Sequence, residues 1–122
     1  MTYHRYMNLN DGKSTGPVTF INVFEIPRED VEVFKAGWRR LAGIMASAPG
    51  FRDARLHEAI SGETRFQLVN VAQWDSEEAW RAAAANPEMR TASQEAGADP
   101  VFQRAIQNTG LYRPIFAFGT EG

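Results

Sequence analysis

The first third of the chain shows a run of strand-forming residues followed by a helical pattern. Residues 18–26, "VTFINVFEI", are rich in β-branched and aromatic side chains and stop at Pro27, which predicts a strand. Pro27 suits the first turn of a helix, and Glu29 and Asp30 suit its positive end. Apolar residues then recur at helical spacing up to the turn residues 48–50, at Val31, Phe34, Trp38, Leu41 and Met45.

Two further strand-like runs follow this helix. They are "FRDARLHEAI" (51–60) and "TRFQLVNVAQW" (64–74), and the short segment 61–63 between them predicts a hairpin. Asp75 and Glu78 have the spacing of a capping box, so a second helix is expected over residues 76–85.

The last third is expected to contain short helices and one strand. Asn86-Pro87 interrupts the second helix, and helical segments are expected through Met89 and again from Pro100 to Gln107. "LYRPIFAF" (111–118) then predicts a last strand, in which Pro114 indicates an edge position or a bulge.

The order β-α-β-β-α-β is typical of a ferredoxin-like α+β fold, an antiparallel sheet with helices on one face. The other face is too apolar to be left in water, and a second copy of the chain is the simplest cover, so we expect a homodimer. Residues 1–16 are polar and end in a Ser-Thr-Gly cluster, which predicts a flexible N-terminal arm before a single domain over residues 17–122.

Composition narrows the function classes. At 122 residues and 43% hydrophobic residues the chain has room for one core. A net charge of -2 without a basic block gives no footprint for nucleic acid or an anionic membrane. The absence of cysteine excludes thiolate chemistry and Cys-based metal sites, and two histidines do not suggest a His-rich one. No apolar stretch has the length of a signal-peptide core or a membrane span, so a cytoplasmic address is expected.

Two strand asparagines share faces with core residues. Alternation places Asn70 with Phe66, Leu68, Ala72 and Trp74, and it places Asn22 with Val18, Phe20 and Phe24. An unpaired buried amide costs roughly 1–3 kcal/mol, so each asparagine either has a partner in the fold or awaits a ligand. Asn70 and Trp74 are separated by roughly 13 Å along the strand, a span that suits a flat polycyclic molecule.

Three stretches carry a resemblance to a known family: "PVTFINVFEIP", "APGFRDARLH" and "VNVAQWDSEEAWR". Over residues 17–118 the chain resembles the antibiotic biosynthesis monooxygenase family, whose members are dimeric α+β barrels of ferredoxin-like chains. "VTFINVF" and "VNVAQW" are similar to strands of its anthrone monooxygenase branch. That resemblance implies Asn22, Asn70 and Trp74 as catalytic residues.

A related actinorhodin-type branch adds further expectations. Its second-strand histidine is matched by His57, its second-helix aromatic by Trp80, and its pocket arginine falls near Arg90. Trp80 and Arg90, together with Phe24 and Phe66 from the strands, are therefore expected to contact the substrate. Residues 91–110 match no branch.

The sequence lacks the G-x-G-x-x-G, P-loop, G-x-S-x-G and H-E-x-x-H patterns. An oxygenase built without a bound cofactor must use the electrons of its own substrate, such as the carbanion of an anthrone or dihydroxyaromatic, which reduces O2 and yields a quinone through a peroxide. Asn22 and Asn70 would orient or stabilise the substrate oxyanion and Trp74 would donate to the oxygenated intermediate. His57 is the candidate base, because its unperturbed pKa is near neutrality.

Three alternatives stay open at this point. Reduced flavin from a partner reductase leaves no dinucleotide motif and could assist the reaction. A non-catalytic ligand-binding or dimerisation module would also fit the pattern. Haem degradation on the same fold is disfavoured, because Ala83 and Ser93 stand where that branch has a tryptophan and an axial histidine.

Overall fold

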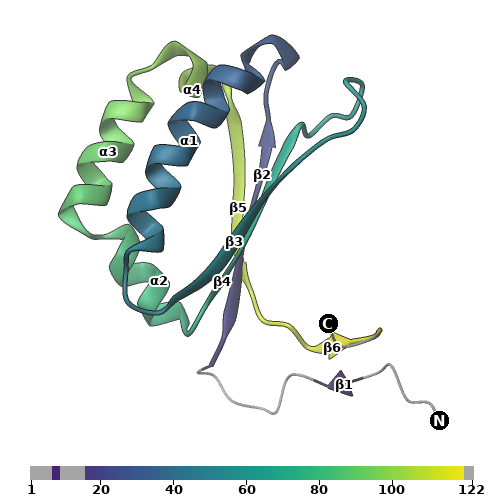
Figure 1. The fold of residues 1–122 in the computed structure, drawn as a ribbon, viewed down its shortest axis with the longest axis vertical. Helices are drawn as coiled ribbons and strands as arrows, with labels where there is room; N and C mark the ends of the chain where they lie inside the picture. The colour runs from purple at the N-terminus through teal and green to yellow at the C-terminus, as the bar shows by residue number, and fades with distance from the viewer. Residues whose placement is uncertain (1–6, 9–15, 120–122) are drawn as a thin grey trace.

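The computed structural model describes residues 7–8 and 16–119, and its main sheet is antiparallel with strand order β3-β4-β2-β5 (Figure 1). The strands are β2 (Val18–Glu25), β3 (Phe51–Glu58), β4 (Leu68–Trp74) and β5 (Ile106–Tyr112). The two strands that carry the asparagines are thus the central pair. This arrangement confirms the predicted ferredoxin-like α+β fold.

All helices lie on one face of this sheet (Figure 1). A 3-10 turn η1 (Arg28–Asp30) leads into α1 (Val31–Ala46), and α2 (Glu77–Ala84), α3 (Pro87–Gly97) and α4 (Pro100–Arg104) follow β4. The opposite face is bare of helices in the described part of the chain (Figure 1).

Each of the three short helices has its own side-chain cap. Ser76 accepts from the amide of Ala79, Asn86 from that of Glu88, and Asp99 from that of Val101. Proline occupies the start of α3 and of α4, where its missing N–H costs nothing.

The predicted pairing of Asp75 with Glu78 as a capping box is wrong. Ser76 is the N-cap, since its hydroxyl meets an amide three residues on. Asp75 instead forms an ion pair with Arg52.

The prediction for the C-terminal third needs correction. Residues 106–107 were expected as a helix end and residues 111–118 as the last strand, but β5 spans residues 106–112. α4 ends at Arg104 because Ala105 is extended. Seven residues of β5 pair with β2, which satisfies the backbone groups along that edge. This non-local pairing overrides the Asn-Thr-Gly loop signal at residues 108–110.

β4 also begins later than predicted, at Leu68 instead of Thr64. Residues 61–67 form a turn in which the buried Gln67 side chain donates to the carbonyls of Ser61 and Thr64. The amide of Gln67 thereby takes over hydrogen bonds that a longer ladder would have made.

Strand register assigns the two faces of the sheet. Asn22 lies opposite Asn70 on β4 and opposite Thr109 on β5, and this row faces the helices. The neighbouring row, with Ile21 and Val71, faces the open side.

β1 (Met7–Asn8) pairs antiparallel with β6 (Phe116–Ala117), apart from the main sheet (Figure 1). Of the predicted N-terminal arm, residues 1–16, only Met7–Asn8 and Gly16 are among the described residues. Among the described residues, every helix is too short or too polar to cross a bilayer.

Candidate active site

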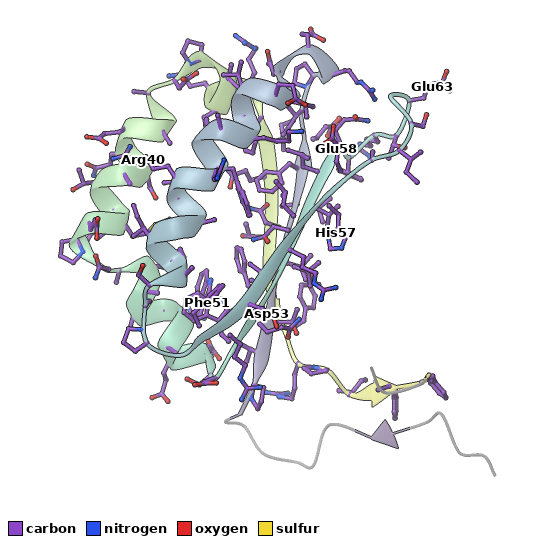
Figure 2. All side chains as sticks on the ribbon, in the orientation of Figure 1. Arg40, Phe51, Asp53, His57, Glu58 and Glu63 are labelled. Carbon is purple, nitrogen blue, oxygen red and sulfur yellow. The ribbon has the colours of Figure 1, made fainter. Side chains whose placement is uncertain are left out.

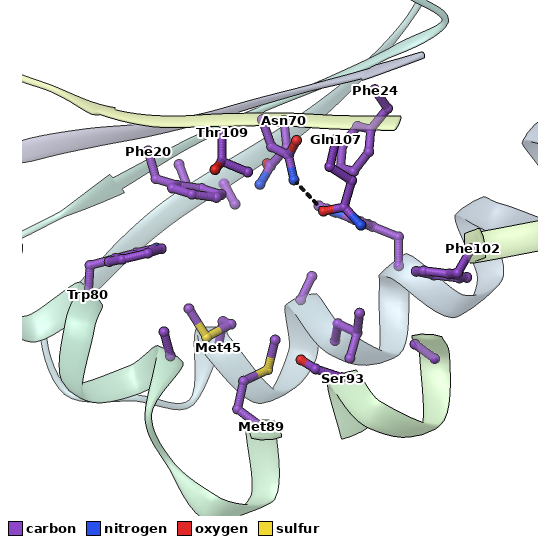
Figure 3. A pocket seen from close by; sticks show the side chains of 18 of the residues that line it. Phe20, Phe24, Met45, Asn70, Trp80, Met89, Ser93, Phe102, Gln107 and Thr109 are labelled. Carbon is purple, nitrogen blue, oxygen red and sulfur yellow. Dashed lines mark hydrogen bonds between the residues drawn. The ribbon is translucent and has the colours of Figure 1, made fainter. Parts of the chain in front are cut away.

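A cavity of about 380 Å³ lies between the helix-facing side of the sheet and the helices (Figure 3). Its volume falls in the range of small-molecule sites. Most of its wall is aromatic or aliphatic, including Phe20, Phe24, Phe34, Trp38, Met45 and Trp74. A ligand that fills it must therefore be largely apolar.

Asn22 and Asn70 interrupt this apolar wall. They are directly opposite each other on β2 and β4 and are only 6% and 8% exposed. Both Oδ1 atoms are buried and have no hydrogen-bond partner. Because a buried acceptor without a partner costs about 1–3 kcal/mol, the pair marks a place where the fold leaves hydrogen-bonding capacity for a ligand.

Gln107 on β5 engages the other end of the Asn22 amide. Asn22 Nδ2 donates to Gln107 Oε1 over 3.0 Å (Figure 3). Gln107 does not stand out in the sequence as a site residue, because the pattern of residues 100–107 predicts a helix. Had the strand been recognised from Ile106, alternation would have placed Gln107 and Thr109 on the face of Asn22.

Trp80 on α2 provides a free donor. Its ring stacks on Phe20 with centroids 5.1 Å apart and planes 25° apart. Its Nε1 is buried and has no hydrogen-bond partner. Residues that line the cavity thus carry two buried acceptors without a partner on the sheet and one such donor on a helix.

Trp74 contributes to the wall beneath α2. It is 1% exposed and meets Phe51 edge to face, with ring centroids 5.3 Å apart. A register shift in β3 between Phe51 and Asp53 places Phe51 opposite Trp74. The ring of Trp74 is held firmly by this contact; its donor role stays a prediction.

The structure does not bring His57, Phe66 or Arg90 to this cavity. His57 projects from the face of β3 that points away from the helices, is exposed, and has its Nδ1 3.3 Å from the carbonyl oxygen of Val69 (Figure 2). Its neighbour Leu56 takes the helix-facing position opposite Asn70. The alternation of β3 therefore separates His57 from the asparagines.

Phe66 and Arg90 are displaced for other reasons. Phe66 precedes β4 and lies under the guanidinium of Arg65, 4.9 Å from its ring centroid. Arg90 is exposed on α3. Of the predicted site residues, those that line one cavity are Asn22, Asn70, Trp74, Trp80 and Phe24.

No described residue that lines the cavity has an ionisable side chain. Within residues 7–8 and 16–119, no three His, Cys, Asp or Glu side chains gather as a metal site would require. Hydrogen-bonding amides, hydroxyls and indoles are the polar groups of the described residues that line this wall.

One end of the cavity is closed by α4. Phe102 stacks on Phe34 with centroids 4.3 Å apart, and Gly37 of α1 makes room for the Phe102 ring. Arg104 forms a two-pronged ion pair with the buried Asp30, at 2.8 and 3.0 Å. Hydrogen bonding from Arg104 lowers the pKa of the Asp30 carboxyl from its usual value.

Comparison with known proteins agrees with this geometry. The family model for antibiotic biosynthesis monooxygenases matches residues 17–95. The chain belongs to the antibiotic biosynthesis monooxygenase family. No functionally curated protein matches the chain.

Two solved structures are similar over most of their length. A candidate monooxygenase from Shewanella loihica PV-4 is 34% identical, with a TM-score of 0.69, over 84% of this chain and 98% of the other. SnoaB, a cofactor-independent oxygenase from Streptomyces nogalater, is 25% identical, with a TM-score of 0.66, over 81% of this chain and 93% of the other. Family and neighbours together support a general monooxygenase activity.

Proposed function

We propose that the protein is a cofactor-independent monooxygenase that uses O2 to oxidise an anthrone-like or dihydroxyaromatic substrate, of polyketide type, to a quinone. The observation that carries the proposal is the pair of unpartnered amide oxygens, Asn22 Oδ1 and Asn70 Oδ1, on residues that line a largely apolar cavity. Such a wall suits a flat aromatic body whose hydroxyl groups reach the sheet. SnoaB has a similar fold and is a cofactor-independent oxygenase, which supports the proposal that this protein needs no cofactor.

The reaction balances with substrate and O2 alone. A ring CH2 group and O2 give a ring C=O and one water, so the substrate supplies all four electrons. One oxygen atom enters the product and the other leaves as water. A bound cofactor is not required for this stoichiometry.

The protein would act by positioning. Asn22 and Asn70 accept hydrogen bonds from the enolic or phenolic hydroxyl and so favour the electron-rich enol over the keto form. Trp80 Nε1 donates to the charge that develops as oxygen adds, a role that the sequence analysis gave to Trp74. Since none of the described residues that line the cavity has an ionisable side chain, the substrate proton would leave through water at the cavity mouth.

The test is oxygen uptake by purified protein, freed of metal and flavin, with a panel of anthrones and dihydroquinones. Uptake above the spontaneous rate, lost in Asn70→Ala, is expected. Uptake that begins only after reduced flavin is added would overturn the cofactor-independent proposal in favour of a flavin-assisted oxygenase. Binding without turnover in either condition would favour a ligand-binding module.

We also propose that the active form is a homodimer joined through the open sheet face. Ile21, Val23, Val69 and Val71 form an apolar centre on that face, and none of the described helices covers it. Light scattering on protein eluted from a size-exclusion column should give twice the chain mass for wild type, and the mass of a monomer for Val71→Arg. A monomeric wild-type protein at micromolar concentration would contradict the proposal.

A further inference from the structure

Asn22 has two amide ends, and the structure uses only one of them. Its Nδ2 donates to Gln107 Oε1 at 3.0 Å, while its Oδ1 is buried without a partner. The end that Gln107 occupies therefore decides which end is left for a ligand. Gln107 lies diagonally across from Asn22, since its direct partner on β2 is Phe24.

Without this contact, the two asparagines have a competing arrangement. Directly opposite residues in an antiparallel pair have Cβ atoms about 4.5–5.5 Å apart, within reach of an amide-to-amide hydrogen bond. A free Asn22 could turn its Nδ2 to the unpartnered Oδ1 of Asn70. That bond would satisfy Asn70 and leave the cavity with a closed amide pair instead of two open acceptors.

We infer that Gln107 is a positioning residue that holds the Asn22 donor away from Asn70 and so keeps both amide oxygens available to substrate hydroxyls. This positioning role deepens the proposed function, and it rests on the proposed function only for the choice of ligand. Gln107 acts through Asn22, so its effect is on the orientation of an amide and on selectivity for hydroxylated ligands.

The first test needs no ligand. Side-chain amide signals of Asn22 and Asn70 are recorded by NMR in wild type, Gln107→Met, Gln107→Glu and Asn108→Ala. Gln107→Met keeps the length of the side chain and removes the acceptor, so both amide signals should shift and a contact between the two amides should appear. Gln107→Glu keeps an acceptor and should retain the wild-type signals.

Asn108→Ala is the matched control. Asn108 is the next residue on β5, faces the other side of the sheet, and donates to the carbonyl of Val23. Its loss disturbs the same strand without touching the Asn22 amide. Unmoved Asn22 and Asn70 signals in Gln107→Met, or equal shifts in Asn108→Ala, would overturn the inference.

The second test measures binding by tryptophan fluorescence with two probes, a vicinal dihydroxyanthraquinone and unsubstituted anthraquinone. Gln107→Met should weaken binding of the hydroxylated probe about five- to tenfold, the size of one net hydrogen bond, with little change for the other. Equal weakening of both probes would mean a merely structural role and would overturn the inference.

The two hypotheses fail separately. If wild type binds neither probe, the proposed substrate class fails, and the NMR comparison alone decides the role of Gln107. If wild type turns over an anthrone but Gln107→Met leaves the amide signals and probe selectivity unchanged, the oxygenase proposal stands and the positioning role is lost.

Discussion

Asn22 and Asn70 lie directly across from each other on the two central strands, both line the same cavity, and each has a buried Oδ1 without a partner. Each such oxygen costs the folded state about 1–3 kcal/mol. Under the proposed function, this cost, which falls twice at adjacent positions, is stability given up for ligand binding.

Replacing Asn70 by alanine should separate activity from stability. We expect turnover to fall about 100-fold, as for loss of one polar group that stabilises a transition state, while the melting temperature stays or rises because an unpaired buried acceptor is removed. Oxygen uptake and thermal unfolding check the two effects.

Gln67→Ala is its matched control, because Gln67 is a buried amide near the start of the same strand whose hydrogen bonds are made within the protein. It should lose about 1–3 kcal/mol of stability and keep its turnover in the folded protein. The opposite pattern in the two variants would contradict the division between satisfied and unsatisfied amides.

Trp80→Phe should retain the fold and lower turnover. A phenylalanine ring preserves the stacking on Phe20 but has no N–H, so we expect a decrease of about 100-fold in turnover. Trp38→Phe is the control, since that indole also lines the cavity but its nitrogen is not among the buried unpartnered atoms. Equal decreases in both variants would show that ring size, and not the N–H, is what counts.

Two glycines of α1 should respond in opposite directions to alanine. At Gly37 a Cβ would come within 2.6 Å of the Phe102 ring, so Gly37→Ala should cost about 1–3 kcal/mol through overpacking. A Cβ added at Gly43 would meet no neighbouring atom within 4 Å, so Gly43→Ala should raise the free energy of unfolding by about 0.5–1 kcal/mol through helix propensity. Urea unfolding of both variants measures the contrast; stabilisation by Gly37→Ala would show that α4 does not rest on this site.

The Asp30–Arg104 pair should make stability dependent on acid pH. Arg104 lowers the folded-state pKa of the Asp30 carboxyl. The contribution of the pair to the free energy of unfolding is therefore fully present above the unfolded-state pKa of about 3.9, and it is lost as pH falls through the folded-state pKa. Arg104→Met should have a lower melting temperature than wild type at neutral pH, and the two curves should converge in acid.

Arg40→Met serves as the comparison for that titration. Its pair with Glu95 is exposed on both sides, and such pairs contribute about 0–1 kcal/mol. If the difference in melting temperature between wild type and Arg104→Met persists unchanged to low pH, Asp30 is ruled out as the titrating partner.

The central part of the fold could be predicted because its signals are local. Strand-forming residues in 18–26 and 64–74 identified the central strands, and helical spacing identified α1. Alternation also placed each asparagine with the core residues of its own strand, and the register shows that Asn22 and Asn70 lie opposite each other on one face of the sheet.

The sequence-based predictions fail where a non-local contact determines the local structure or the position of a side chain. β5 has weak strand propensity in its Asn-Thr-Gly centre and forms because β2 offers an unpaired edge, so Gln107 was invisible as a site residue. His57 was carried over by resemblance, although alternation relative to Leu56 could have indicated its opposite face. The choice of Trp80 Nε1 as the free donor depends on burial in three dimensions, which no spacing reveals.

Apart from α1, the helices that cover the sheet are short and separately capped, with proline at the start of α3 and of α4. The sheet supplies the paired amides, whereas Met89, Ser93 and Phe102 on these short helices shape the far wall. Because each piece begins with its own signals, its length and side chains can change without altering strand register. Under the proposed function, α3 and α4 would therefore set the substrate range while the polar groups on the sheet stay in place.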